Sequence, residues 1–375
     1  MKKLLYTALA TLALFASLFT SCSKKSQLTP VNIKPIVYQN ENVTVKVDPK
    51  LELLLIGLRL AEVDIFKNNY YSQDYSQFVD GVDSLFAKQK EHPFVKDLRA
   101  RGKNYKKSIL SILQISQYIS DDLTNMTIKQ KEIPEPLLDF WKGVNLKSFI
   151  AQFNDFAISS NYERIWVLYE AHLKRQAINV QEYFSFNKSI TDWISKYYFS
   201  SDKNIEYEFY ASTLTAGYNF ALLSETEDNK ITIKEICTAY RNKDNDGNKF
   251  QSCYEVSSGY VYSLVKKHWS LISEEANRLA KSIYEENQST EKITEYVVQS
   301  FTSQLLAFFC IFDFDLIRND EEWYTAVYNA ISQAFLIKNV DNFLSLTEEY
   351  QTNREKYPDF ESFFVNYIPE AIKSF

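Results

Sequence analysis

Residues 207–240 read YEFYASTLTAGYNFALLSETEDNKITIKEICTAY, and within them the periodicity of the chain changes. Three runs are rich in β-branched and aromatic residues, as strands are: Tyr207–Leu214, Tyr218–Leu223 and Ile231–Tyr240. The polar run that follows, Asn242–Asn248, is typical of a hairpin turn. Elsewhere apolar residues recur every three or four positions, which predicts helices. We therefore expect an α+β fold, mostly α, in which helical subdomains flank a small antiparallel sheet.

Helices are expected on both sides of this β-like region. Before it, the apolar spacing predicts helices over about 50–67, 74–90, 104–119, 146–159, 162–177 and 180–198. After it, the same spacing predicts helices over about 254–286, 290–310, 320–337, 339–353 and 359–373. One further short strand is expected at Val43–Val47, followed by Asp48 as an N-cap and Pro49 at the first helical position.

Composition and charge exclude several classes of protein. With 45% hydrophobic and 24% charged residues, the chain is neither disordered nor collagen-like. The net charge is 42 − 48 = −6 and no long basic run occurs, so nucleic acid is not an expected partner. Only 7 glycines occur and no two lie close together, which excludes P-loop and dinucleotide-binding loops.

The histidines and the polar run 242–248 do not indicate a catalytic or metal-binding site. The 3 histidines, His92, His172 and His268, do not cluster, and we expect each to be structural or exposed. The run 242–248 half-matches a calcium-binding loop, but Cys253 stands at the twelfth position, where a bidentate Glu is needed. We therefore expect a plain turn there.

The N-terminus is typical of an export signal. Two lysines precede an apolar segment, Leu4–Phe19, which is shorter than the roughly 20 residues that a membrane span needs. The segment ends in LFTSC at 18–22, which resembles the lipobox of bacterial lipoproteins and makes Cys22 the expected lipidation site. Two alternatives stay open: an ordinary secretory signal with an incidental cysteine, and an uncleaved anchor.

The residues after Cys22 suggest where a lipoprotein of this kind would be sorted. Ser23 stands where an Asp would favour inner-membrane retention, so we expect a cell-envelope protein anchored in the outer membrane. Lys24 and Lys25 replace the acidic run that resembles a surface-export signal, so we expect the periplasmic face. The lipid anchor would make the membrane a partner.

The remaining cysteines would lie in a compartment that permits disulfides. Cys310 lies in the apolar run LLAFFCIF and is expected to be a buried thiol. Cys237 and Cys253 flank the polar turn and are candidates for a disulfide between two strands, with free thiols as the alternative. No C-x-x-C motif occurs, so a cysteine zinc site is not expected.

Residues 254–265 read YEVSSGYVYSLV. This segment resembles the active-site helix of a poorly characterised bacterial, gluzincin-like metallopeptidase family, whose members carry H-E-F-x-H-S-F-V-N-P-L-V there. The opening VDPKLELL at 47–54 is similar to the family's V-D-P-R-x-E-L-L, and TEYVV at 294–298 is similar to its N-E-H-L-V element. Together with Glu91-His92-Pro93 and the strand pair before the motif, the resemblance covers most of the mature chain.

The resemblance implies a gluzincin-metallopeptidase-like fold and the position of a zinc site. In the family, two histidines one helical turn apart and a Glu from a later helix bind zinc, and the Glu after the first histidine is the general base. In this chain the histidine positions fall on Tyr254 and Ser258, the base on Glu255 and the third ligand on Glu295. A phenol and a hydroxyl are poor zinc ligands. We therefore expect zinc to be lost, with no cofactor and no catalytic residue, and these four residues as a remnant site.

The expected function is a pseudoenzyme that serves as a binding module, with a peptide or an envelope protein as partner. In this interpretation 1–21 is the signal peptide and 22–42 a tether. The peptidase-like domain, 43–375, has an N-terminal helical part (43–200), a β meander (201–253) and a second helical part (254–375). Two alternatives remain: a zinc metallopeptidase with substituted ligands, and an unrelated helical structural or assembly lipoprotein of the outer membrane.

Overall fold

The computed structural model describes most of the chain from Ile33 to Ser374. The described residues are 33–66, 73–102, 105–123, 125–134, 137–138, 141–222, 225–227, 230–238, 246–286, 295–314, 317, 319–335 and 340–374. They belong to one compact unit that begins at Ile33. The expected signal peptide, the lipidation site Cys22 and the first part of the expected tether lie outside the described residues.

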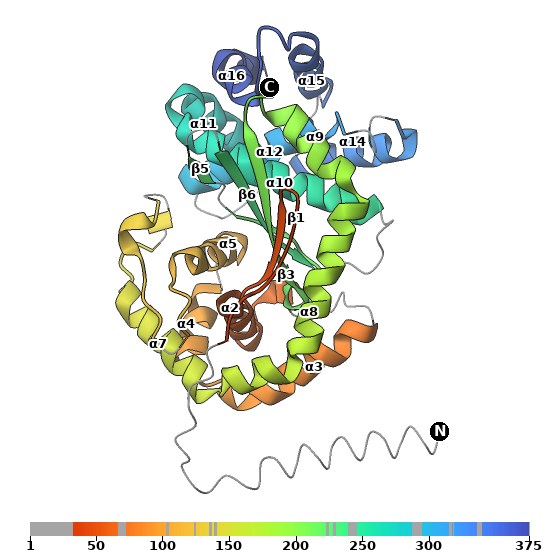
Figure 1. The fold of residues 1–375 in the computed structure, drawn as a ribbon. Helices are drawn as coiled ribbons and strands as arrows, with labels where there is room; N and C mark the ends of the chain where they lie inside the picture. Colours follow the sequence, from red (N-terminus) through yellow and green to blue (C-terminus); the bar gives the residue numbers. More distant parts are fainter. Residues whose placement is uncertain are drawn as a thin grey trace, which may run out of the picture. The chain divides into compact units, whose positions relative to one another are not determined.

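A mixed sheet crosses the middle of this unit (Figure 1). Its strands are β1 (Ile36–Asn40), β2 (Val43–Val47), β3 (Asn204–Ser212), β4 (Phe220–Ala221), β5 (Glu225–Glu227) and β6 (Lys230–Thr238). Their order is β1-β2-β3-β6-β4, and β5 also pairs with β6. β2, β3 and β6 run parallel to one another, whereas β1, β4 and β5 pair antiparallel with their neighbours.

The expectation of an antiparallel sheet was wrong, although the α+β, mostly α class is confirmed. The chain between β2 and β3 passes through the whole N-terminal helical part and returns to the same end of the sheet. Such a crossover makes β3 parallel to β2. The alternation of side chains along a strand does not depend on strand direction, so the sequence pattern could not reveal this.

The expected tether also ends earlier than 42. β1 forms a hairpin with β2, in which Ile36 is opposite Val47 and Asn40 is opposite Val43. β1 is an edge strand whose residues are exposed or half-buried, so it lacks the apolar alternation that identifies a strand in a sequence.

The N-terminal helical part lies between β2 and β3. It consists of α2 (Pro49–Leu60), η1 (Asp64–Phe66), α3 (Gln73–Phe86), η2 (Ala87–Gln89), α4 (Pro93–Gly102), α5 (Tyr105–Ile115), η3 (Ser116–Tyr118), η4 (Gln130–Glu132), α7 (Leu146–Ser159), α8 (Tyr162–Phe186) and α9 (Lys188–Tyr198). As expected, Asp48 caps α2 by accepting a hydrogen bond from the Lys50 amide, with Pro49 in the first turn. The sequence pattern missed α4 and placed the break between α8 and α9 too early.

The C-terminal part is helical apart from the strands after β3. It consists of η5 (Thr213–Thr215), α10 (Asp246–Lys267), α11 (Trp269–Glu286), α12 (Glu295–Ile311), α14 (Glu321–Phe335), α15 (Val340–Thr352), α16 (Phe360–Asn366), α17 (Ile368–Ala371) and η6 (Ile372–Ser374). The helix expected at 359–373 is divided into α16, α17 and η6. The helix expected at 254–286 is broken at His268, whose Nε2 lies 2.7 Å from Oε1 of Glu361. None of the helices described is both long enough and apolar enough to cross a bilayer.

α10 also begins well before residue 254, so the end of the expected β meander is helical. Asp246 and Gly247, expected in the turn, are the first residues of the helix. A carboxylate in a first helical turn is favourable because it complements the helix dipole. Asp246 also pairs with Lys249, with 2.9 Å between Oδ1 and Nζ.

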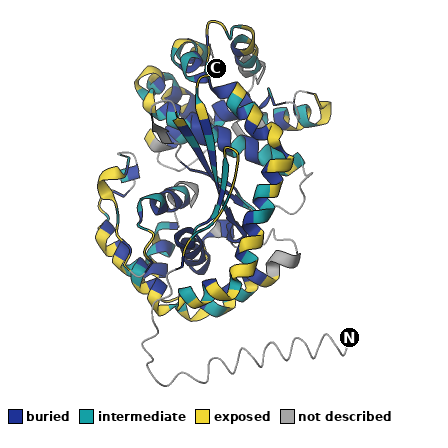
Figure 2. Ribbon diagram, viewed as in Figure 1, coloured by how far each residue is buried: buried dark blue, intermediate teal, exposed yellow. Residues whose placement is uncertain are grey.

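One face of the sheet carries the main core. Val45, Phe209 and Ile233 are buried on this face. α8 packs along β1, β2 and β3, and the Phe184 ring of α8 stacks on Phe209 with 3.7 Å between ring centroids. α10 packs on β6 and β4, and α12 packs on α10. Buried residues concentrate in the inner strands of the sheet and in α2, all of whose residues are buried, whereas the outer sides of α3, α7 and α8 are exposed (Figure 2).

Candidate functional site

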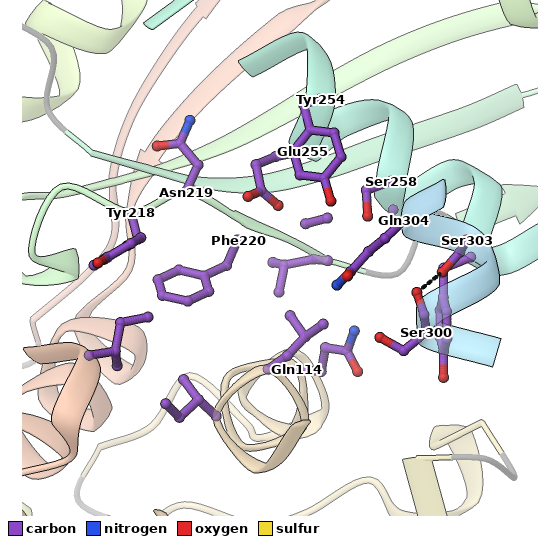
Figure 3. A pocket seen from close by; sticks show the side chains of 17 residues that line it. Gln114, Tyr218, Asn219, Phe220, Tyr254, Glu255, Ser258, Ser300, Ser303 and Gln304 are labelled. Carbon is purple, nitrogen blue, oxygen red and sulfur yellow. Dashed lines mark hydrogen bonds between the residues drawn. The ribbon is translucent and has the colours of Figure 1, made fainter. Parts of the chain in front are cut away.

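A pocket of about 380 Å³ lies where α10, α12, β4 and α5 meet (Figure 3). Its lining from α10 is Tyr254, Glu255, Ser258, Gly259 and Tyr262, and its lining from α12 is Ser300, Ser303 and Gln304. Residues 218–222, which include β4, form a second wall, and Ile65, Ile109, Leu110 and Gln114 form a third. The volume falls within the range typical of small-ligand sites.

Three of the four residues of the expected remnant site line this pocket: Tyr254, Glu255 and Ser258. Tyr254 and Ser258 are four positions apart on α10, so they lie one turn apart on the same face. Figure 3 shows the Glu255 carboxylate and the hydroxyls of Tyr254 and Ser258 around the same space. The structure therefore places these three side chains in the lining of one pocket.

Tyr254 is held in place by other aromatic rings. Its ring lies 4.2 Å from the ring of Phe308 and is parallel to that of Phe250 at 6.5 Å, measured between centroids. Burial raises the pKa of Tyr254 well above its usual value, and the charge of Glu255 raises it further. The phenol therefore stays neutral at physiological pH.

Gly259 allows α10 to approach β4 closely. A Cβ atom at this position would lie 2.8 Å from the Cβ of Ala221 and 3.2 Å from the carbonyl oxygen of Leu222. Any side chain at Gly259 would push the helix away from the strand. This glycine therefore sets the distance between the two walls of the pocket.

Glu295 does not join the site, which corrects the expected ligand set. It is exposed at the start of α12, and its carboxylate accepts a hydrogen bond from Nε2 of Gln299 at 3.0 Å. The α12 residues that line the pocket are Ser300, Ser303 and Gln304. Glu295 precedes Ser300 by five positions, and five positions on a helix of 3.6 residues per turn place two side chains on different faces.

The sequence reasoning missed a buried carboxyl group, that of Glu235. Glu235 is fully buried on β6, opposite Ala221 of β4 and on the same face of the sheet as Phe209. Neither of its carboxyl oxygens makes a hydrogen bond of normal geometry. Burial, followed by the charge of Glu255, raises the pKa of Glu235 well above its usual value, and the polar groups of Cys237 and Asn219 lower it by less. Burial of Glu235 therefore favours its neutral, protonated form.

A signal for Glu235 does exist in the sequence. Along β6 the core face carries Ile231, Ile233, Glu235 and Cys237, so a Glu stands in an apolar alternation. A charged residue at such a position is expensive to bury and marks a strand for closer inspection.

The residues present do not fit the zinc ion that the family resemblance implies. Among the residues described, no group of three or more His, Cys, Asp or Glu side chains could hold a metal ion. Tyr254 is a neutral phenol, Ser258 a hydroxyl, and Glu295 lies outside the pocket. The pocket therefore contributes one carboxylate, that of Glu255, which is not a zinc ligand set.

None of the cysteines and histidines that the structure describes lines the pocket. Cys237, Cys253 and Cys310 are buried free thiols, so the structure contains no disulfide between Cys237 and Cys253. Cys253 belongs to helix α10, whereas the candidate disulfide assumed that it was on a strand. The histidines act elsewhere: His92 pairs with Asp155, His268 pairs with Glu361, and His172 stacks on Phe78.

A second cavity, of about 440 Å³, lies beside α9 and α15. Three of its polar side chains, those of Trp193, Asp313 and Arg354, make structural hydrogen bonds. The Arg354 guanidinium donates to the carbonyl of Tyr197 at the end of α9, and the Trp193 indole donates to Oδ2 of Asp313 at 3.2 Å. The pocket beside Glu255 is therefore the stronger candidate for a ligand site.

No protein-family model matches this chain, and no curated protein or solved structure matches it either.

Proposed function

We propose that this chain is a cell-envelope lipoprotein, lipid-anchored through Cys22 in the outer membrane, whose metallopeptidase-like domain has lost its zinc and binds peptides. The partner is a free peptide or an extended segment of an envelope protein. The observation that carries this proposal is the pocket beside Glu255, one wall of which is formed by residues 218–222 around the edge strand β4.

β4 offers hydrogen-bonding groups to an extended peptide. It pairs antiparallel with β6, with Phe220 opposite Ile236, and the Leu222 amide donates to the Lys234 carbonyl at 2.9 Å. In an antiparallel pair, successive residues point their N–H and C=O groups to opposite sides of the strand. The N–H and C=O of Ala221 therefore point away from β6, at an edge where no other described strand pairs. A peptide could add there as a further strand.

The other walls would hold the side chains of such a peptide. Ile65, Leu110 and Phe220 supply apolar surface, whereas α10 and α12 supply hydroxyl and amide groups. Apolar lining with a few polar groups is the usual composition of a site that binds a ligand specifically.

Binding without hydrolysis agrees with the residues present. A carboxylate general base needs an activated nucleophile, which a metal-bound water supplies in the related peptidases. No histidine is among the described residues that line the pocket, so none is seen to activate a water beside Glu255 or the hydroxyl of Ser258. The chain therefore keeps a peptide cleft in which no described group activates water.

The test is a binding measurement on the purified full chain in detergent. A pool of short random peptides labelled at their C-termini is titrated with the protein and followed by fluorescence polarisation. The wild type should bind, and Ser258→Trp, which fills the pocket, should weaken binding by about tenfold or more. Ser270→Trp, on the exposed face of α11, is the matched control and should bind as the wild type does.

Two results would contradict the proposal. One is that no peptide in the pool binds. The other is that Ser258→Trp and Ser270→Trp bind peptides equally well while circular dichroism shows both to be folded.

A further inference from the structure

A group of exposed apolar side chains lies where α7 ends and α8 begins. Ile158, Val167 and Leu168 are 62%, 52% and 52% exposed. α8 buries Tyr162 and Trp166 against the core, and at about 100° per residue Val167 and Leu168 lie towards its outer side. Single exposed apolar residues are ordinary on a protein surface, whereas a group of them is typical of an interaction surface. We call Ile158, Val167 and Leu168 the apolar corner.

Basic side chains border the apolar corner. Arg164 is exposed and lies one helical turn before Leu168 on α8. Gln89 of η2 donates a hydrogen bond to the carbonyl of Ser159 at 3.1 Å, which brings the exposed Lys88 beside the end of α7. An apolar surface bordered by basic side chains suits the interface of a bilayer that contains anionic lipids.

The acidic side chains of the same turns do not reverse this charge. Glu170 lies 2.9 Å from Nζ of Lys174, and Asp155 lies 3.0 Å from Nε2 of His92. Glu163 is half-buried. The exposed surface around the corner is therefore not acidic, although the whole chain carries a net charge of −6.

The described chain begins at the same end of the unit as the apolar corner. Ile36, at the start of β1, is opposite Val47, the last residue of β2, and Pro49 follows two residues later. The phenol of Tyr162, the first residue of α8, donates to the Pro49 carbonyl at 2.9 Å. Figure 1 shows α2 and the beginning of α8 at this end of the unit. The chain therefore enters the unit near the turn between α7 and α8.

The expected lipid anchor would keep this end of the unit near a bilayer. From the expected lipidation site Cys22 to Ile33 the chain can span at most about 40 Å. α8 alone, with 25 residues, has a length of about 37 Å. The tether is therefore little longer than one helix of the unit, so the surface where the chain enters is the one that the anchor holds near the membrane.

From these observations we propose that the apolar corner inserts into the surface of the bilayer that carries the lipid anchor, with Lys88 and Arg164 against anionic headgroups. The proposal rests on the lipid anchor of the proposed function and is independent of peptide binding. The covalent lipid would hold the protein at the membrane, and the corner would fix the orientation of the unit on it.

The experiment places a polarity-sensitive fluorophore at the apolar corner of the full lipidated chain. The thiols of Cys237, Cys253 and Cys310 are buried, so a thiol-reactive probe labels the introduced cysteine of Leu168→Cys. The protein is reconstituted in vesicles of phosphatidylethanolamine and phosphatidylglycerol, with and without bromine on the acyl chains. Leu271→Cys, which replaces an exposed leucine of α11, is the matched control. We expect bromine to quench the probe at 168 about twofold more than the probe at 271.

Charge reversal tests the contact with anionic headgroups. Arg164→Glu, combined with the probe at 168, should lower the quenching, and so should vesicles without phosphatidylglycerol. Lys356→Glu reverses a charge at an exposed position after α15 and should leave the quenching unchanged.

Equal quenching at 168 and 271 on vesicles that carry the protein would overturn insertion of the corner and leave the lipid anchor intact. A blue shift of the probe at 168 without quenching by bromine would mean that a second copy of the chain or another protein covers the corner, which also overturns the proposal. If the full chain does not float with the vesicles, the anchor and the insertion are both wrong, whereas peptide binding that Ser258→Trp weakens would still stand.

Discussion

Gly259 and Ala221 are the pair of residues that brings helix α10 onto strand β4. The added Cβ of any other residue at 259 would lie 2.8 Å from the Cβ of Ala221, which is far inside normal contact. Glu255 and Ser258 precede Gly259 on the same helix, so their positions in the pocket depend on this contact.

We expect Gly259→Ala to lower the free energy of unfolding by roughly 1–3 kcal/mol, because the helix must move away from the strand. In the double variant Gly259→Ala, Ala221→Gly, the closest clashing atom is absent, so part of the loss should be recovered. Urea unfolding of the four proteins in this cycle measures the coupling. If the two changes have additive effects on the free energy of unfolding, the close contact between positions 259 and 221 is contradicted.

Glu52 of α2 is a second residue with a testable effect, because its burial should make the free energy of unfolding depend on pH. It is buried, and burial raises its pKa to about 8, with the hydroxyl of Ser212 acting in the opposite direction. Between about pH 5 and pH 8 the folded chain keeps this proton and the unfolded chain releases it. Stability therefore falls as the pH rises through this window, by about 1.4 kcal/mol per pH unit for one proton.

We expect Glu52→Gln to remove this contribution, so that its free energy of unfolding depends less steeply on pH from about 5 to 8. Denaturant unfolding at several pH values measures the slope. Glu274→Gln is the control at an exposed position and should keep the wild-type slope. Equal slopes for wild type and Glu52→Gln would refute the buried, protonated state of Glu52.

At the scale of elements, the contact between α10 and α12 determines which side chains face the pocket. α12 presents Ser300, Ser303 and Gln304 to it, and Glu295 lies on another face. Figure 3 shows the Gln304 side chain directed towards the space beside Ser258. Gln304, unlike Glu295, therefore lines the same pocket as Tyr254 and Ser258.

We expect the triple variant Tyr254→His, Ser258→His, Gln304→Glu to bind zinc more tightly than the double histidine variant. Adding Glu295→Gln to the double variant should change nothing, because this carboxylate lies outside the pocket. Calorimetric titration of the folded variants with zinc measures both effects. If Glu295→Gln weakens zinc binding and Gln304→Glu does not strengthen it, the assignment of the α12 residues that face the pocket is wrong.

The periodicity of apolar residues in the sequence predicted the main strands and the buried face of the helix that follows them. The runs Tyr207–Leu214 and Ile231–Tyr240 correspond to β3 and β6, and the apolar face of the helix after them is buried at Val261 and Val265. The position of Tyr254 and Ser258 on one face of a helix also followed from their spacing, whereas the pocket that they line depends on the packing of β4, α5 and α12 as well.

The features that the sequence could not reveal depend on contacts between distant segments. Strand direction in the sheet is set by the crossover between β2 and β3, which leaves no trace in side-chain period. The face of α12 that meets the pocket is set by its packing on α10, so Glu295 could not be placed from a short motif. β1 is identified as a strand by its pairing with β2 and not by its own pattern.

At the scale of the whole molecule, one compact unit begins at Ile33, and a lipid anchor is expected at Cys22. Cys22 lies outside the described residues, and the anchor remains a prediction. Residues 23–32 would separate the lipid from the unit that carries the pocket.

We expect Cys22→Ser to release the chain from membranes, because the apolar segment Leu4–Phe19 is too short to span a bilayer stably. Membrane and soluble fractions after a carbonate wash measure the release, with Ser23→Ala as the neighbouring control. Retention of Cys22→Ser in the washed membranes would show that the protein is held there by something other than a lipid on this cysteine.

The proposed function requires that a peptide adds to the outer edge of β4 beside Glu255. Residue-resolved hydrogen exchange with and without a saturating binding peptide tests it most directly. The amide of Ala221 points away from β6 and should exchange more slowly when the peptide is bound, while amides around Ser270 on α11 stay unchanged. Peptide binding that leaves Ala221 exchange unaltered, or that protects the cavity beside α9 instead, would contradict the account.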